Sequence, residues 1–422
     1  MNLPTLLRAN FQQPLVVAAV SVVAAHLVAS SLFFMDASHF ERVFWAVVST
    51  TVLGFATYVY SSLRPLARGV VCVVIAVPAI TVGIGIHAVH VYQVGVHESD
   101  YTGIAMLVAG PVLLVAGSTF LVRTVHTWWR RLLLLPIAPV FAFFVLFPVT
   151  LGVGASNGAR VACCDETPAD HGFAYEDVTF ETPKGLMLSA WYVPSQNGAT
   201  IIVVHGSGNN RETTLPEAMM LARNGYGLLM LDVEGFGNSE GRGNAYGWTG
   251  ARSVHAAIDY LHSRPDVDPE RIGGLGLSMG GEVLLQAAGE SPLLAAVVSE
   301  GGTGRTTADF EKVDDGWFQP IVPFFAVVET TMRLISHEPT PPPLLDMVRQ
   351  IGPRPVFLLA GNLSEETDLM GLYLEEGGPS FEMWTIPEAA HNQGYELHPE
   401  EYEQRVVAFF HRALLGQDGR VD

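Results

Sequence analysis

The first third of the chain is dominated by long apolar runs. Each is long enough to cross a hydrocarbon core of about 30 Å, which takes about 20 helical residues, and none contains Asp, Glu, Lys or Arg. Surface helices of water-soluble proteins show a polar face, and these runs show none. We therefore expect an all-α domain of about five transmembrane helices in residues 1–155. The runs are Pro14–Phe34, Val43–Leu63, Gly69–Val91, Gly103–Val122 and Leu132–Ala155.

The arginines that flank these runs predict an orientation. Cytoplasmic loops of membrane proteins are enriched in Lys and Arg. With five spans, one side of the membrane receives six arginines and the other side two. We expect a multi-pass protein of the cell membrane whose N-terminus is cytoplasmic and whose C-terminal domain is extracytoplasmic. The six are Arg8, Arg64, Arg68, Arg123, Arg130 and Arg131, and the two are Arg42 and Arg160.

After residue 155, short apolar runs alternate with helical patterns. Runs such as Ile201–Val204 and Leu228–Leu231 are continuously apolar, which is typical of parallel strands buried on both faces. Strands that alternate with helices predict a parallel sheet covered by helices. We expect one α/β domain over residues 156–422, with a mostly parallel sheet of eight strands. The expected strands are Tyr175–Thr182, Met187–Val193, Thr200–His205, Gly227–Asp232, Ile272–Leu277, Leu294–Ser299, Pro355–Ala360 and Phe381–Ile386.

One long segment interrupts this alternation. Residues 304–354 separate two expected strands, and a connection of that length within a compact domain is usually functional. Its aromatic residues include Trp317, Phe318, Phe324 and Phe325. We expect a cap over the active site that lines an acyl pocket or touches the bilayer; ordinary helices at the edge of the sheet are the alternative.

Charge and cysteine content narrow the range of partners. The chain carries a formal net charge of −19, although residues 1–155 hold seven Arg against four acidic residues. Nucleic-acid binding needs clustered Lys and Arg, so we expect no nucleic-acid partner. The chain has three cysteines, Cys72 and the adjacent pair Cys163 and Cys164. Two adjacent cysteines can form a disulfide with each other only with strain. A link to another chain, a lipid or a metal, or two inert thiols, are the alternatives.

A catalytic serine is predicted at Ser278. The sequence Gly276-Leu277-Ser278-Met279-Gly280 follows the expected strand Ile272–Leu277 and precedes a helical pattern. This strand–turn–helix context is the one that a nucleophile elbow requires. Small residues flank the serine because its backbone must turn sharply to expose the hydroxyl.

A serine nucleophile needs a base, and that base needs a carboxylate. His391 follows the last expected strand, so it has the position of the base in the chain order serine, acid, histidine. The acid should follow the strand Pro355–Ala360. Glu365 is our first choice there, with Glu366, Asp368 and Glu300 as alternatives.

The oxyanion hole needs two N–H donors. We expect one from Met279 and the other from Ser207, in the loop after the third strand. Together these residues predict acyl transfer to Ser278 and deacylation by water that His391 activates. Such a mechanism needs no metal and no organic cofactor.

Three motifs resemble the α/β-hydrolase superfamily, in its bacterial esterase, lipase and dipeptidyl-peptidase-like branch. They are HGSGNNRE from His205, LDVEGFGNSEG from Leu231 and RPDVDPERIGGLGLSMGGE from Arg264. The resemblance extends from about residue 175 to residue 415 and implies the α/β-hydrolase fold. Two positions depart from the family pattern: Glu234 replaces an Arg, and Ser364 stands where the family usually has Asp.

Four functions are compatible with these residues. A serine hydrolase that cleaves carboxylic esters, lipid-like ones included, agrees best with a membrane anchor and an aromatic cap. A serine peptidase of the dipeptidyl-peptidase type, an acyltransferase and a non-catalytic sensor or scaffold are the alternatives. The expected partners are an ester substrate and the lipid bilayer.

Overall fold

The chain divides into two compact units, Met1–Leu151 and Gly152–Asp422. The computed structural model describes residues 59–60, 63–88, 100–125, 127–132, 140–157, 160–243, 246–312, 322–362 and 364–416. The expected span Pro14–Phe34 and nearly all of Val43–Leu63 lie outside these residues.

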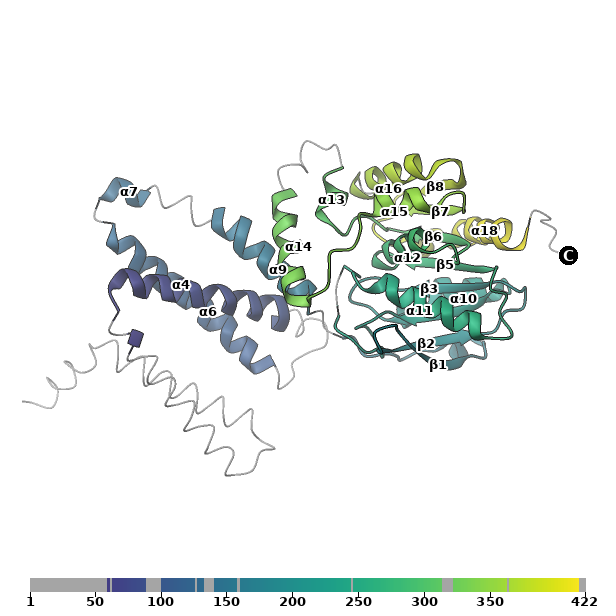
Figure 1. Ribbon diagram of the computed structural model, residues 1–422, viewed down its shortest axis with the longest axis horizontal. Helices are drawn as coiled ribbons and strands as arrows, with labels where there is room; N and C mark the ends of the chain where they lie inside the picture. The colour runs from purple at the N-terminus through teal and green to yellow at the C-terminus, as the bar shows by residue number, and fades with distance from the viewer. Residues whose placement is uncertain are drawn as a thin grey trace, which may run out of the picture. The chain divides into compact units, whose positions relative to one another are not determined.

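The described part of the first unit is helical (Figure 1). Two of its helical segments are long and apolar enough to cross a membrane, Pro65–Val82 (α4) and Gly103–Thr124 within α6. A third apolar stretch, Ala142–Ala155, is shorter. Two of the five expected spans thus coincide with helices long enough to cross a membrane, and residues 133–139 of the expected span Leu132–Ala155 lie outside the described residues. The helical segments are α4 (Pro65–Val82), η1 (Gly83–Ala88), α6 (Asp100–Thr124), α7 (Trp128–Leu132), η2 (Ala142–Leu146) and α9 (Phe147–Ala155).

Glycines let α4 and α6 pack closely. A Cβ atom at Gly110 of α6 would lie 2.6 Å from Cγ1 of Ile80, and one at Gly117 would lie 2.9 Å from Cβ of Cys72. Interfaces of this kind, in which small residues let two backbones approach, are common between membrane helices.

The second unit is built on an eight-stranded sheet with the order β1-β2-β4-β3-β5-β6-β7-β8. β2 pairs antiparallel with β1 and β4, and all other pairs are parallel. The sheet is thus mixed, and its two antiparallel pairs, both formed by β2, lie at one end. The strands are β1 (Glu176–Glu181), β2 (Met187–Val193), β3 (Thr200–Val204), β4 (Gly227–Asp232), β5 (Ile272–Leu277), β6 (Ala296–Glu300), β7 (Val356–Ala360) and β8 (Phe381–Thr385).

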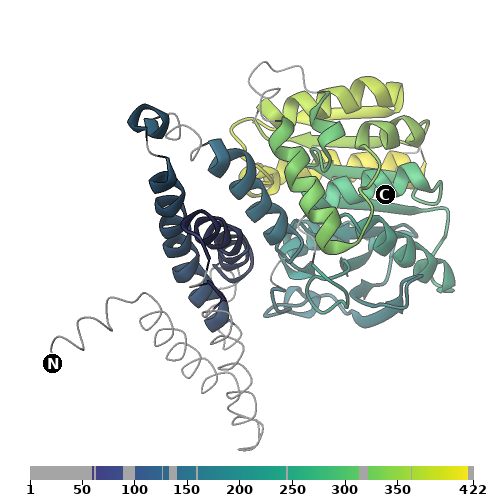
Figure 2. The same ribbon diagram turned by 60° about the vertical axis from the view of Figure 1, so that its left-hand side comes forward.

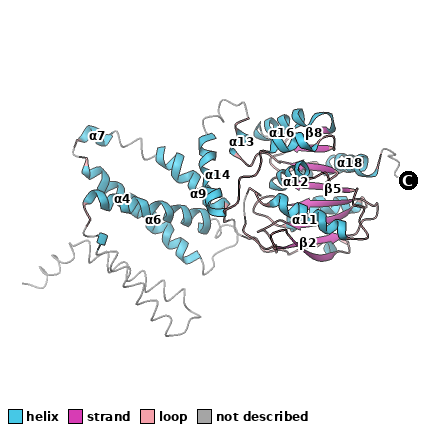
Figure 3. Ribbon diagram, in the orientation of Figure 1, coloured by secondary structure: helices cyan, strands magenta, loops and turns pink. Residues whose placement is uncertain are grey.

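Helices cover both faces of the sheet, as Figure 3 shows in cyan against magenta strands. Successive residues of β3 enter opposite cores: Ile202 and Val204 pack with α11, α12, α15 and α16, and Ile201 and Val203 pack with α10 and α18. This explains why the central strands are continuously apolar. The helices are α10 (Leu215–Arg223), α11 (Gly250–Ser263), α12 (Met279–Glu290), α15 (Leu344–Ile351), α16 (Ser364–Gly377), α17 (Gly394–Leu397) and α18 (Pro399–Phe410).

The segment expected as a cap contains two further helices, α13 (Thr307–Phe310) and α14 (Val322–Ser336). Figure 2 shows α14 in green. Phe324, Val328 and Met332 of α14 form a small apolar core with Ala155 and Trp248. Residues 313–321, which include the expected aromatic residues Trp317 and Phe318, lie outside the described part of the chain.

Candidate active site

Ser278 lies on the sharp turn between β5 and α12, as expected. Its backbone angles are φ 51° and ψ −120°, a conformation that residues with a side chain rarely adopt. The flanking glycines are required by space: a Cβ at Gly276 would lie 2.3 Å from the carbonyl carbon of Gly280, and one at Gly280 would lie 2.2 Å from the carbonyl oxygen of Val204. The two glycines therefore allow the close backbone packing on which the sharp turn at Ser278 depends.

The structure brings His391 to Ser278. Nε2 of His391 lies 2.8 Å from Oγ of Ser278, although 113 residues separate them in sequence. Nδ1 of His391 is hydrogen-bonded to Oε1 of Glu366. A carboxylate can only accept, so Nδ1 carries the proton and Nε2 is free to accept the serine proton. The hydrogen bond to Glu366 is the main reason that the pKa of His391 is raised above 6.5.

The carboxylate at His391 is therefore Glu366, one residue after the expected Glu365, whose side chain lies outside the described part of the chain. Glu366 is 3% exposed, and its Oε2 accepts from the N–H of Gly361 at 2.8 Å. The alternative Asp368 is exposed to solvent. The other alternative, Glu300, instead holds the loop after the histidine, because its two oxygens accept from the N–H of Gly394 (3.0 Å) and the hydroxyl of Tyr402 (2.8 Å).

The helical spacing of apolar residues in the sequence points to Glu366. Glu366 has the spacing of the buried residues Leu369, Met370 and Tyr373 on α16, three, four and seven positions later. Residues with these spacings share one face of a helix. Helical periodicity therefore selects Glu366 over its neighbour, whereas position after the strand does not.

The loop expected to complete the oxyanion hole lies beside the nucleophile. A Cβ at Gly206 would lie 3.5 Å from Cβ of Ser278. Met279 begins α12, and its N–H is one of the helix-terminal amides that have no intrahelical partner. Ser207, the expected second donor, is the next residue of the loop and is exposed.

The buried His205 fixes the peptide group that carries the N–H of Ser207. Nδ1 of His205 donates to the carbonyl oxygen of Gly206 at 2.8 Å, and Nε2 accepts from the N–H of Val233 at 3.3 Å. Burial lowers the pKa of this imidazole, so it stays neutral. Because C=O and N–H point in opposite directions across a trans peptide, the N–H of Ser207 points away from His205.

The far end of the same loop is tied down by Asp232. Its oxygens accept from the N–H and Nη1 of Arg211, at 2.7 and 2.8 Å, and from the N–H of Asn238 at 2.9 Å. The guanidinium of Arg211 also stacks on Trp191, 4.5 Å from the ring centroid. This buried ion pair rigidifies the loop that begins at Gly206.

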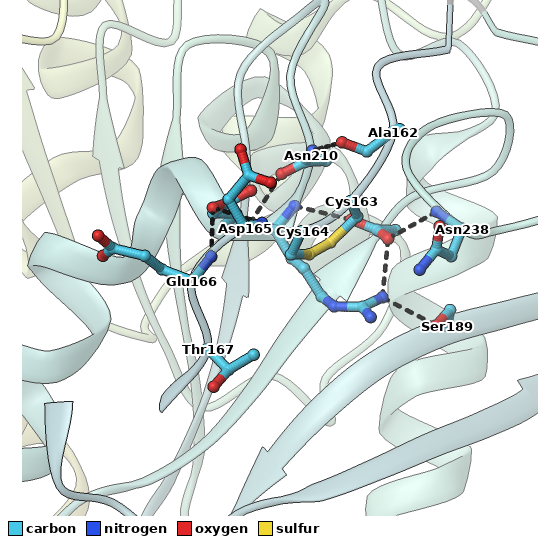
Figure 4. The surroundings of a disulfide bond; sticks show 12 residues. Ala162, Cys163, Cys164, Asp165, Glu166, Thr167, Ser189, Asn210 and Asn238 are labelled. Carbon is cyan, nitrogen blue, oxygen red and sulfur yellow. Dashed lines mark hydrogen bonds and ion pairs between the residues drawn. A yellow bond between two sulfur atoms is a disulfide. The ribbon is translucent and has the colours of Figure 1, made fainter. Parts of the chain in front are cut away.

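A second support comes from the segment that contains the adjacent cysteines (Figure 4). The structure joins Cys163 and Cys164 by a disulfide bond. Beside it, the carbonyl oxygen of Ala162 accepts from Nδ2 of Asn210 at 3.0 Å, and Oε1 of Glu212 accepts from two N–H groups at 2.9 and 2.7 Å. The start of the second unit is thus hydrogen-bonded to the loop after β3.

Glu234, which stands where the resembled pattern has an Arg, forms an ion pair with Arg252. Both of its oxygens bind Arg252 of α11, with a closest approach of 2.8 Å. Glu338, just after α14, lies 3.4 Å from Arg252 and 2.7 Å from Nζ of Lys184. Glu234 therefore belongs to an ion-pair network that reaches the end of α14.

Within the described residues, no group of three or more His, Cys, Asp or Glu side chains is placed to hold a metal ion. The site combines a hydroxyl in contact with an imidazole and a buried carboxylate at the other ring nitrogen, an arrangement that is compatible with acyl transfer.

Comparison with solved structures identifies the fold. An esterase of Pyrococcus furiosus aligns with 61% of this chain and 98% of its own, with a TM-score of 0.51 and 24% sequence identity. Residues 152–422 therefore have the α/β-hydrolase fold, and we call them the hydrolase domain. At this level of identity the likeness concerns the fold alone.

Sequence comparisons find similarity to known proteins over part of this domain. Residues 170–334 of the hydrolase domain match the model of the X-Pro dipeptidyl-peptidase (S15) family. The protein YfhR of Salmonella typhi is 37% identical over 129 residues, which are 29% of this chain and 42% of YfhR. A thiohydrolase of Aspergillus aculeatus, aneE, is 28% identical over 186 residues, or 43% of this chain and 58% of its own. The chain thus spans about half the length of these two relatives.

Proposed function

We propose that the hydrolase domain is a serine hydrolase that cleaves carboxylic esters, lipid-like esters among them. The observation that carries this proposal is the 2.8 Å contact between Nε2 of His391 and Oγ of Ser278, with Glu366 bound to the opposite ring nitrogen. The α/β-hydrolase fold and its esterase neighbour support it, as does the strained turn at Ser278.

The chemistry proceeds in two halves. Oγ of Ser278 attacks the ester carbonyl carbon while Nε2 of His391 takes its proton, and Glu366 stabilises the imidazolium that forms. The alcohol leaves with that proton, and the acyl group stays on Ser278. A water molecule then gives its proton to His391 and attacks the acyl carbon, which releases the acid and restores the serine.

The negative oxygen of each tetrahedral intermediate needs donors that are already in place. The N–H groups of Met279 and Ser207 are the proposed pair. Loss of one such donor typically lowers the rate by about 10²- to 10³-fold. The hydrogen bonds of His205 and Asp232 keep the loop of Ser207 from rearranging during the reaction.

The preference for apolar esters rests on the surroundings of Met279. A Cβ at Gly247 would lie 2.6 Å from Cγ of Met279, so the loop before α11 packs directly on the residue after the nucleophile. The next residue, Trp248, belongs to the apolar core with Phe324 and Met332 of α14. An acyl chain that entered beside Met279 would meet apolar and aromatic side chains.

Membrane anchoring through the first unit is part of the proposal. Valines of α4 and α6 are largely exposed, with exposed fractions of 63% at Val74 and 68% at Val115. Soluble monomers rarely leave large apolar patches uncovered. An anchored enzyme would meet substrates that partition into the bilayer.

A serine peptidase of the dipeptidyl-peptidase type is the second candidate, because the matching family model describes such an enzyme. The two reactions share the acyl-enzyme, so substrate panels separate them. Hydrolysis of p-nitrophenyl esters without cleavage of X-Pro dipeptide p-nitroanilides would favour the esterase, and the reverse would favour the peptidase.

The first test is labelling of the detergent-solubilised full-length protein with a fluorophosphonate probe. We expect the wild type to be labelled and Ser278→Ala not to be. Ser263→Ala, at an exposed position of α11, is the control and should be labelled like the wild type. A folded wild type that the probe does not label would overturn the proposal and favour the sensor or scaffold.

A further inference from the structure

The loop that follows β6 lies against the ring of His391. A Cβ at Gly301 would lie 2.8 Å from Cε1 of His391, and Gly301 itself has a φ of +63°. On its other side the loop packs on the nucleophile helix, because a Cβ at Gly302 would lie 3.2 Å from the backbone nitrogen of Glu282. The loop therefore contacts both the imidazole of His391 and the backbone of Glu282 in α12.

The carboxyl group of Glu282 holds this loop from α12, and the hydroxyl of Tyr373 holds it from α16 by donating to the carbonyl oxygen of Thr303 at 2.6 Å. Oε1 of Glu282 accepts from the N–H of Thr303 at 3.2 Å and from its hydroxyl at 3.3 Å. The N–H of Glu282 in turn donates to the carbonyl oxygen of Ser278 at 3.2 Å. Glu282 is 6% exposed, so its hydrogen bonds are shielded from water. A single residue thus connects the serine's own turn of helix to the loop behind the histidine.

We propose that Glu282 is a positioning residue of the active site, which fixes the Gly301–Thr303 loop against His391 through its hydrogen bonds to Thr303. The proposal rests on the proposed function, and it assigns to Glu282 a task separate from that of Glu366. Glu366 orients the ring through Nδ1, whereas Glu282 limits how far the ring can retreat from Ser278.

The charge of Glu282 also bears on the base. Burial raises the pKa of Glu282 to about 7, and its negative charge contributes to the raised pKa of His391, after that of Glu366. The charges of Glu282 and His391 therefore influence each other's titration. The other groups around Glu282 are Arg305 and Asp309 from the start of the cap, Tyr373 from α16, and Tyr246.

The direction of the effect on activity follows. The reaction needs neutral His391, so the acidic limb of the kcat/KM profile reports its pKa. The negative Glu282 stabilises the imidazolium, which moves that limb to higher pH. Removing the charge should move the limb to lower pH.

The experiment compares two variants of the full-length protein with p-nitrophenyl butyrate as substrate. Glu282→Gln keeps an oxygen for Thr303 and removes only the charge, and we expect the midpoint of the acidic limb to fall by about 0.3 to 1 pH unit. Thr303→Val removes the hydroxyl donor, and we expect kcat to fall by roughly 5- to 30-fold with little change in KM.

Glu290→Gln is the matched control. Glu290 lies two turns further along the same helix and pairs with His255, 2.9 Å away, so its variant should keep the wild-type profile. An unshifted acidic limb in Glu282→Gln, or an unchanged kcat in Thr303→Val, would overturn the proposal while Ser278 is still labelled. Absence of labelling in the wild type would overturn the proposed function and this inference with it.

Discussion

At the scale of single residues, the triad depends on which of two adjacent glutamates faces the histidine. Glu366 binds Nδ1 of His391, and its other oxygen is held by the N–H of Gly361. A carboxylate fixed at both oxygens keeps the imidazole in the tautomer that leaves Nε2 free for the serine proton.

We expect Glu366→Ala to lower kcat by about 10³- to 10⁴-fold, because the imidazolium loses its carboxylate and the ring loses its orientation. Glu365→Ala is the matched control, one position away and identical in chemistry, and should stay within about twofold of the wild type. Initial rates with p-nitrophenyl butyrate measure both. Equal losses in the two variants would contradict the assignment of Glu366.

At the scale of elements, the network around Arg252 links α11, the turn after β4 and the end of α14. Glu234 is 5% exposed, and Arg252 is its only ion-pair partner among the described residues. Nη1 of Arg242 also binds the carbonyl oxygen of Ile335, near the end of α14, at 2.9 Å. Three basic residues, Arg242, Arg252 and Lys184, therefore hold the end of α14.

Arg252→Ala should destabilise the hydrolase domain by about 3 kcal/mol, because the Glu234 carboxylate would stay buried without its partner. That loss lowers the Tm of a domain of this size by roughly 6–12 °C. Lys184→Ala removes an exposed partner of the same network and should cost less than about 1 kcal/mol. Thermal melting of the detergent-solubilised protein compares the two variants. Equal Tm values would contradict the prediction that the Glu234–Arg252 pair stabilises the domain more than the exposed Lys184 contact does.

The sequence predicted features that depend on local patterns, but not contacts between residues on different elements. Each strand, from β1 to β8, is a short run of residues whose apolar pattern is local, so it was visible in the sequence. The nucleophile elbow was visible for the same reason. The pairing of Glu234 with Arg252 was not, because the two residues lie on different elements and only the packing of α11 brings them together. The antiparallel placement of β2 likewise depends on pairing between strands, which no local pattern encodes.

At the scale of the whole molecule, the chain joins two units of different composition. The first unit contributes apolar helices with few charges, and the second contributes a hydrolase domain in which nearly all the acidic residues lie. Two of the five expected spans, at α4 and in α6, coincide with described helices that are long and apolar enough to cross a membrane. The side on which the hydrolase domain would lie depends on the full number of spans, and the arginine distribution predicts it.

The five expected spans, with six arginines on the N-terminal side, predict a hydrolase domain outside the cytoplasm. We expect protease added to sealed, right-side-out membrane vesicles to digest the hydrolase domain, as detected by an antibody against its C-terminus. A cytoplasmic marker protein inside the same vesicles should survive until detergent is added. Protection of the hydrolase domain would instead require an even number of spans. The substrates would then be lipids or other esters of the inner face, because an active site can act only on molecules that reach its side of the bilayer.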